Sequence, residues 1–305
     1  MQLYLPIAGI SVNVLLLLGL GGLVGFLSGL FGVGGGFLMT PLLMLLGIPP
    51  AVAVATGANQ VVAASISGVL AHMRRGNVDF KMGLVLMAGG LMGSGAGVGL
   101  YTLLRRLGHL DLVIAISFVV FLIGIGSLML FESVRAILRL RKGSPRRKLH
   151  QHTWLHGLPF KMRFPRSRLY ISVLLPIAIG FFVGVLTALM GVSGFIMVPA
   201  MNYLLGMPTI TVIGTSLFQI IFVTANVTFL QAVENQTVDV VLAIVLLAAG
   251  VIGAQIGSRF AGRLPGEHLR GLLALLVLAV GIQISFGLFT TPADLYSLGG
   301  AASTE

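Results

Sequence analysis

Two glycine-rich stretches hold the backbone groups best suited to chemistry in this sequence. The first reads GLFGVGGGFLMTP at residues 29–41, and the second reads ALMGVSGFIMVP at residues 188–199. Both are otherwise apolar, so a helix that breaks and restarts at the glycines leaves its first N–H groups without intrahelical partners. The first turn of a helix also carries a partial positive charge, which favours anions. Each stretch therefore predicts an anion site that needs no charged side chain.

We expect the anion to lie where the helix restarts after each glycine run. Glycine allows a positive φ at the break, and its missing side chain lets an oxyanion approach the backbone. Pro41 and Pro199 follow five residues after the last glycine, where they leave a carbonyl unpaired or kink the short helix. The residues predicted to bind the anion at the restarts are Gly34, Gly35, Gly36, Phe37, Ser193, Gly194 and Phe195.

Close helix packing is the alternative explanation for glycines in apolar segments, because small residues four apart bring membrane helices together. We favour packing for two other series, Gly89, Gly93 and Gly97, and Gly250, Gly253 and Gly257. A nucleotide site is not predicted, since no Gly-Lys-Ser/Thr follows the glycines and no soluble strand-helix unit surrounds them.

Each glycine stretch is followed by polar residues inside an apolar span, TGANQ at residues 56–60 and TSLFQ at residues 215–219. Polar side chains at membrane depth are costly and often mark ligand pathways. Their amides and hydroxyls can donate hydrogen bonds to an oxyanion. In the alternative interpretation, they bond neighbouring helices. The predicted side-chain ligands are Thr56, Asn59, Gln60, Thr215, Ser216 and Gln219.

The elements that position these residues must be membrane helices. Of the 305 residues, 57% are hydrophobic and only 9% are charged, and the mean hydropathy is +1.05. About 20 apolar residues are enough to cross a bilayer as a helix. The absence of cysteine excludes disulfides, thiolate metal sites and cysteine nucleophiles. Long spans are predicted at 10–31, 52–73, 82–104, 110–131, 169–190, 211–232, 240–260 and 268–289, with short apolar segments at 36–47 and 194–206.

The chain contains an internal repeat. The segment from 25 to 49 aligns with the segment from 184 to 208, and the match continues through the polar segments and through AGGLMGSGAG at 88–97 and AAGVIGAQIG at 248–257. The sequence therefore predicts two copies, at about 8–131 and 169–290. The expected fold is an all-α polytopic membrane protein with about five helical segments in each copy, the first broken at glycine and the second short.

Loop charge indicates how the two copies are oriented. The loop RRGNVDFK at 74–81 is basic, whereas its counterpart ENQTVD at 234–239 has no Lys or Arg. Cytoplasmic loops are enriched in Lys and Arg, so equivalent loops are expected on opposite sides and the copies are inverted. With both termini outside, 17 of the 19 basic residues are cytoplasmic, and only Arg105 and Arg106 are not. Four parallel crossings per copy are the alternative, but they do not explain this asymmetry.

The expected organisation is an N-terminal membrane repeat (1–131), a basic cytoplasmic linker (132–168), a C-terminal membrane repeat (169–290) and a short polar tail (291–305). The linker carries eleven basic residues, and we expect it to fix topology and to contact anionic lipid headgroups, not nucleic acid. Its stretch HQHTWLH at 150–156 offers three imidazoles, but hydration of these histidines is favoured over a metal site. No cofactor is predicted.

Ionisable residues are absent from the centres of the predicted spans, which argues against a buried carboxylate relay and a voltage sensor. Asp79 and Asp239 stand at matched helix starts, where capping is the favoured role and gating the alternative. His72 lies near the end of its span, where a bonded histidine is favoured over a proton site.

The doubled glycine motif, each copy followed by an LLGxP turn and a polar Thr-to-Gln helix, resembles the sulfite exporter TauE/SafE family, also called the toluene sulfonate uptake permease family. The resemblance covers about 10–131 and 169–290. It implies a multi-pass carrier of the bacterial inner membrane for sulfur-containing anions such as sulfite or organosulfonates. The long basic linker departs from many members of this family.

The expected function is therefore secondary transport of a small sulfur-containing oxyanion by alternating access, with the anion between the two breaks near the midplane. A facilitator or anion channel, and a carrier of another small organic anion, are the alternatives. An enzyme is not expected, because the spans offer no nucleophile with a nearby base. A homo-oligomer is compatible with the sequence.

Overall fold

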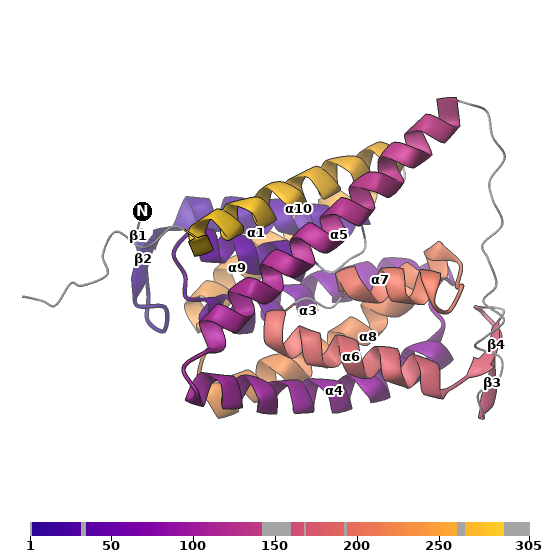
Figure 1. The fold of residues 1–305 in the computed structure, drawn as a ribbon, viewed down its shortest axis with the longest axis horizontal. Coiled ribbons are helices and arrows are strands. Elements are labelled where there is room, and N and C mark those ends of the chain that lie inside the picture. The colour runs from indigo at the N-terminus through magenta and orange to yellow at the C-terminus, as the bar shows by residue number, and fades with distance from the viewer. Residues whose placement is uncertain are drawn as a thin grey trace, which may run out of the picture.

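The computed structural model describes residues 2–31, 35–141, 160–167, 169–191, 194–260 and 266–289. Within these ranges the chain forms ten α-helices, one π-helical turn and two β-hairpins. The helices form a bundle, and the hairpins lie at its opposite ends (Figure 1).

The helices follow the predicted segments closely, except that α5 continues past the predicted end at 131, to Arg141, into the segment predicted as linker. In the first half they are α1 (Val14–Phe31), α2 (Gly36–Leu45), α3 (Pro50–Arg74), α4 (Phe80–Arg106) and α5 (Leu110–Arg141). In the second half they are α6 (Leu174–Met190), α7 (Gly194–Tyr203), α8 (Thr209–Leu230), the π-helical turn η2 (Gln231–Asn235), α9 (Val240–Phe260) and α10 (Gly266–Phe289). The break after the first helix and the short second helix are thus confirmed in both halves.

The bundle is that of a multi-pass membrane protein. Five helices are long and apolar enough to cross a bilayer, within Pro50–Arg74, Phe80–Arg106, Leu110–Arg135, Thr211–Asn235 and Val240–Gly257. The apolar segments Val14–Leu30, Leu174–Met190 and Ala274–Gly287 are shorter. Large apolar side chains such as Leu15, Val120 and Phe286 are exposed on the outside of the bundle, where hydrocarbon suits them better than water.

One β-hairpin precedes the first helix of each half, and the prediction that the helical spans begin at 10 and at 169 was wrong. Strands β1 (Gln2–Leu5) and β2 (Ile10–Asn13) pair as an antiparallel hairpin, and β3 (Lys161–Phe164) and β4 (Leu169–Ser172) pair in the same register. The predicted spans at 10 and 169 begin instead at 14 and 174. Polar side chains end the strands, because Asn13 Oδ1 accepts from Leu15 N–H at 3.0 Å and Ser172 Oγ accepts from Leu174 N–H at 3.3 Å.

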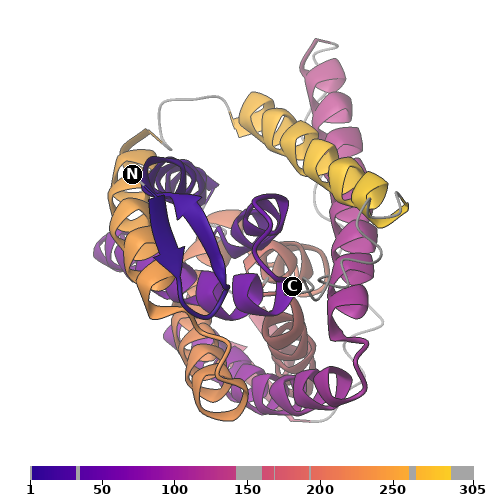
Figure 2. The same ribbon diagram turned by 90° about the vertical axis from the view of Figure 1, so that its left-hand side faces the viewer.

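The main helix contacts come in matched pairs between the halves. Helix α1 packs on α9 as α6 packs on α4, while α3 packs on α8 and α5 on α10. Helices α5 and α10 lie together on one flank of the bundle (Figure 2). The central α3 and α8 carry the polar segments, so both sets of predicted ligands lie on helices that contact each other.

Glycine makes the closest of these contacts possible. A Cβ on Gly93 would lie 2.0 Å from Phe181 O, and one on Gly253 would lie 2.1 Å from Gly22 O. No side chain fits at such distances, so both pairs of helices touch backbone to backbone. The packing interpretation of the two glycine series is confirmed at Gly89, Gly93, Gly97, Gly253 and Gly257, whereas an added Cβ at Gly250 would meet the side chain of Gln60.

Candidate functional site

The two helix restarts meet at one place in the bundle. The rings of Phe37, at the start of α2, and Phe195, at the start of α7, stack with centroids 4.2 Å apart and planes 14° from parallel. Both side chains are buried. The structure therefore brings together the two glycine stretches, which are more than 150 residues apart in the chain.

Left-handed glycines form the breaks. Gly35 has a φ of +69° directly before α2, and its carbonyl accepts from the N–H groups of Leu38 and Met39 at 3.2 Å. Gly191 has the same φ at the end of α6, and its N–H donates to Thr187 O at 2.8 Å. This conformation is costly for any residue with a Cβ. The predicted ligands Gly34 and Ser193 lie outside the described residues.

The breaks also touch each other directly. A Cβ on Gly36 would lie 2.4 Å from Gly191 O and 2.6 Å from Val61 Cγ2. Gly191 in turn faces Thr40, because a Cβ added to Gly191 would lie 3.2 Å from Thr40 Oγ1. The restart of α2 therefore packs against the break of the other half.

The prolines stand inside the short helices, as predicted. Pro41 lies in α2 and Pro199 in α7. Because proline has no N–H, the carbonyls of Phe37 and Phe195 lack the donor that an α-helix normally supplies four residues later. Each short helix thus has a weakened first turn beside the stacked rings.

The two glutamines are buried at matched positions of α3 and α8. Gln60 Nε2 donates to Gly21 O at 3.0 Å, whereas Gln60 Oε1 has no partner among the described residues. Gln219 is fully buried, and neither its Nε2 nor its Oε1 has a partner there. An unpaired buried polar group costs about 1–3 kcal/mol. Such a cost makes Gln219 the strongest candidate ligand among the predicted residues.

Each glutamine reaches a glycine of the other half. A Cβ on Gly250 of α9 would lie 2.5 Å from Gln60 Nε2, and a Cβ on Gly90 of α4 would lie 2.7 Å from Gln219 Nε2. These glycines leave room for the amides. The sequence did not identify Gly90 as a neighbour of Gln219, because this contact arises only when α4 and α8 pack together.

Thr56 and Thr215 bond the backbone of the opposite half. Thr56 Oγ1 accepts from Asp239 N–H and Thr215 Oγ1 accepts from Asp79 N–H, both at 3.0 Å. Both threonines are fully buried. These bonds match the alternative interpretation, in which the polar residues join neighbouring helices, and each hydroxyl keeps its own hydrogen for a further acceptor.

The two aspartates are helix caps, as predicted. Asp79 Oδ1 accepts from Met82 N–H at 3.2 Å at the start of α4, and Asp239 Oδ1 accepts from Leu242 N–H at 3.1 Å at the start of α9. Carboxylates suit this position because they pair free N–H groups at the positive end of the helix.

The second oxygen of each aspartate holds a hairpin. Asp79 Oδ2 accepts from Ser167 N–H at 3.0 Å and from Ser167 Oγ at 2.5 Å. Asp239 Oδ2 accepts from Ile7 N–H at 3.0 Å. We call Thr215, Asp79 and Ser167 the Asp79 latch, and Thr56, Asp239 and Ile7 the Asp239 latch. The hairpins were missed in the sequence, where the available signal was a proline directly after the first short strand in both halves, Pro6 and Pro165.

The remaining predicted ligands differ in their bonding. Asn59 Nδ2 is buried without a partner in the described part of the chain, so it can still donate to a ligand. Ser216 Oγ donates to Ile213 O at 3.1 Å within its own helix. Ser65, which sequence reasoning did not select, is fully buried and its Oγ has no partner among the described residues.

No group of three or more His, Asp or Glu side chains that could hold a metal ion occurs in the described ranges. The histidines of 150–156 lie outside these ranges. The polar groups that the structure places at the site are backbone groups, amides and hydroxyls, which can hydrogen-bond a small polar molecule.

Comparison with known proteins indicates a membrane transporter. A family model described as Sulfite exporter TauE/SafE matches residues 17–284. The probable membrane transporter protein YjnA of Bacillus subtilis is 30% identical over 275 residues, covering 90% of this chain and 99% of that protein. A probable membrane transporter protein of Xylella fastidiosa is 29% identical over 279 residues, covering 89% and 95%. No solved structure gives a significant match.

Proposed function

Because the chain belongs to the sulfite exporter TauE/SafE family, we propose that it is a secondary transporter of a small sulfur-containing oxyanion, sulfite or an organosulfonate. Gln219 carries the proposal. Its amide is fully buried beside α4 with neither polar atom paired among the described residues. A ligand that pairs this amide repays the cost of burying it, so the vacant bonding capacity is best explained by substrate.

The pattern of unpaired atoms narrows the ligand class. Gln219 Nε2 and Asn59 Nδ2 are donors and suit the oxygens of an oxyanion. The side-chain oxygens Gln60 Oε1 and Gln219 Oε1 are acceptors and need a donor on the ligand. A monoprotonated anion such as hydrogen sulfite, or a sulfonate with a hydroxyl or amino group, offers both. The proton then travels on the anion, which agrees with the absence of ionisable residues from the centres of the spans.

The positive potential for the anion comes from the starts of α2 and α7, which meet at the stacked rings of Phe37 and Phe195. Gly36 packs against Gly191 of the other half. A carrier in which one half moves against the other can break and remake such a contact, so we favour the carrier over a channel with a continuous filter.

We further propose that the two halves are inverted, with both termini outside and the basic linker on the cytoplasmic side. The hairpins at opposite ends of the bundle (Figure 1) support this arrangement, as does the charge difference between 74–81 and 234–239. Each latch joins a hairpin at one end to a threonine one turn before a glutamine of the site. Opening one latch at a time would expose the site to one side of the membrane at a time.

Counterflow in proteoliposomes tests this function. Vesicles loaded with unlabelled sulfite should take up external labelled sulfite faster than empty vesicles, because a carrier returns faster with bound substrate. A series of sulfite, sulfate, thiosulfate and sulfonates with and without a donor group then ranks the substrates. Equal uptake in loaded and empty vesicles, with currents far above carrier turnover, would favour the channel instead.

A further inference from the structure

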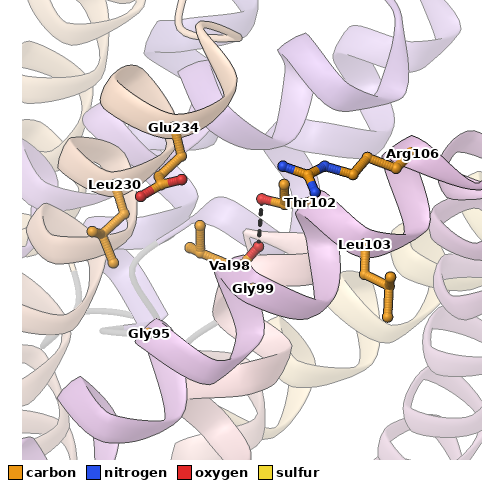
Figure 3. Close-up of a pocket in the computed structure, with 8 residues that line it drawn as sticks. All are labelled: Gly95, Val98, Gly99, Thr102, Leu103, Arg106, Leu230 and Glu234. Atoms are coloured by element: carbon orange, nitrogen blue, oxygen red, sulfur yellow. Dashed lines mark hydrogen bonds between the residues drawn. The ribbon is translucent and has the colours of Figure 1, made fainter.

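A pocket lies where the end of α4 meets η2. Its volume is about 440 Å³, and its lining residues are Gly95, Val98, Gly99, Thr102, Leu103, Arg106, Leu230 and Glu234 (Figure 3). Arg106 is one of the two basic residues that the predicted topology places outside the cytoplasmic segments. The loop-charge pattern does not explain why a basic residue stands at this position, whereas the pocket suggests a role for it.

Opposite charges stand on two walls of this pocket. Arg106 extends from α4 and Glu234 from η2. Figure 3 marks no hydrogen bond between these two side chains. Both residues are exposed. A ligand that carries an anionic group and a cationic group can therefore contact both walls at once.

The wall that carries Glu234 is held firmly against α4. Thr102 Oγ1 donates to Asn235 Oδ1 at 3.2 Å, and the Arg105 guanidinium donates to Asn235 O. Asn235 Nδ2 donates to Gln231 Oε1 at 2.8 Å. These bonds use Arg105 to fix η2 and leave Arg106 to face the pocket.

The rest of the pocket is an open apolar groove. An added Cβ at Gly95 or Gly99 would meet no atom within 4 Å, unlike Gly93 and Gly97, which pack against α6. Leu103, 53% exposed, borders the same groove. Because this face of α4 is on the outside of a membrane bundle, its natural contact is an acyl chain.

We propose that this pocket binds a membrane phospholipid whose headgroup carries a phosphate and a primary ammonium. Arg106 pairs the phosphate, Glu234 pairs the ammonium, and an acyl chain lies along Gly95 and Gly99. A free zwitterion would match the two charges but would leave the glycine groove unfilled. This site is independent of the proposed transport site, from which it differs in position, lining and ligand.

Native mass spectrometry of the full chain, released from nanodiscs of equal parts phosphatidylethanolamine, phosphatidylcholine and phosphatidylglycerol, tests the site. The wild-type protein should retain phosphatidylethanolamine preferentially. Arg106→Gln should lower its retention about fivefold, as expected for one basic residue at a headgroup. Glu234→Gln should remove the preference over phosphatidylglycerol, and Gly99→Leu should lower retention of all three lipids by filling the groove.

Matched controls keep the result specific to the pocket. Arg259→Gln changes an exposed arginine in the last turn of α9, and Gly124→Leu fills another open glycine position, on α5. Both should retain lipid as the wild type does. Equal retention of the three lipids by the wild type, equal losses in the controls, or full displacement by water-soluble glycerophosphoethanolamine would each overturn the proposal.

Discussion

Phe37 and Phe195 stack ring on ring at the contact between the two halves of the molecule, with centroids 4.2 Å apart. Each is the second residue of a short helix that restarts after a glycine break. The pair therefore brings the starts of the two short helices together, and the start of each helix carries a partial positive charge. This convergence is the structural basis for the proposed anion site.

Substitution at Gly36 tests how tightly the breaks are packed. Gly36→Ala should destabilise the protein by about 1–3 kcal/mol, because its Cβ would overlap the carbonyl of Gly191. The matched control is Gly57→Ala on α3, where an added Cβ makes contacts of 3.4 Å and longer. The control should be neutral or stabilising by up to about 1 kcal/mol, since alanine favours helix. Thermal unfolding in detergent measures both, and equal stability of the two variants would contradict the packing.

The latches predict which hairpin each aspartate holds. Asp79→Asn should raise amide hydrogen exchange in the hairpin at 161–172, and Asp239→Asn should raise it in the hairpin at 2–13, because each substitution weakens the acceptor for that hairpin's N–H group. The hairpin at the other end of the bundle is the internal control in each case. Faster exchange in both hairpins from either substitution would indicate general loosening and not two separate latches.

Inversion of the two halves predicts opposite sidedness of equivalent loops. The chain has no cysteine, so Asn77→Cys and Gln236→Cys provide single labelling sites without further changes. In whole cells, an impermeant maleimide should label the site at 236 and should reach the site at 77 only after permeabilisation. Labelling of both sites in intact cells would refute the inverted topology.

Much of this fold follows from local sequence. The ten helices could be predicted because apolar runs of the right length are separated by polar breaks, and Gly35 and Gly191 mark the breaks through their left-handed backbone. The aspartate caps were equally predictable, since Asp79 and Asp239 directly precede apolar runs.

The rest depends on contacts between distant segments. The four-residue strands β2 and β4 are too short to be told from helix ends by pattern alone. That Thr56 bonds Asp239, and that Gly90 makes room for Gln219, depends on which helices of the opposite half lie alongside. No local signal reports these partners, so the polar residues were found but their individual bonds were not.

The central claim is that the buried amide of Gln219 binds the transported anion, and its most direct test is the thermal stability of Gln219→Leu with and without anion. Because Gln219 has no partner among the described residues, the ligand-free variant should be at least as stable as the wild type. Gln255→Leu, at an exposed glutamine of α9, is the control.

A bound anion at 100 times its Kd stabilises a protein by about 2.7 kcal/mol. The account predicts that sulfite or a donor-bearing sulfonate raises the Tm of the wild type and of Gln255→Leu but leaves the Tm of Gln219→Leu unchanged. A Tm shift in Gln219→Leu equal to that of the wild type would contradict it.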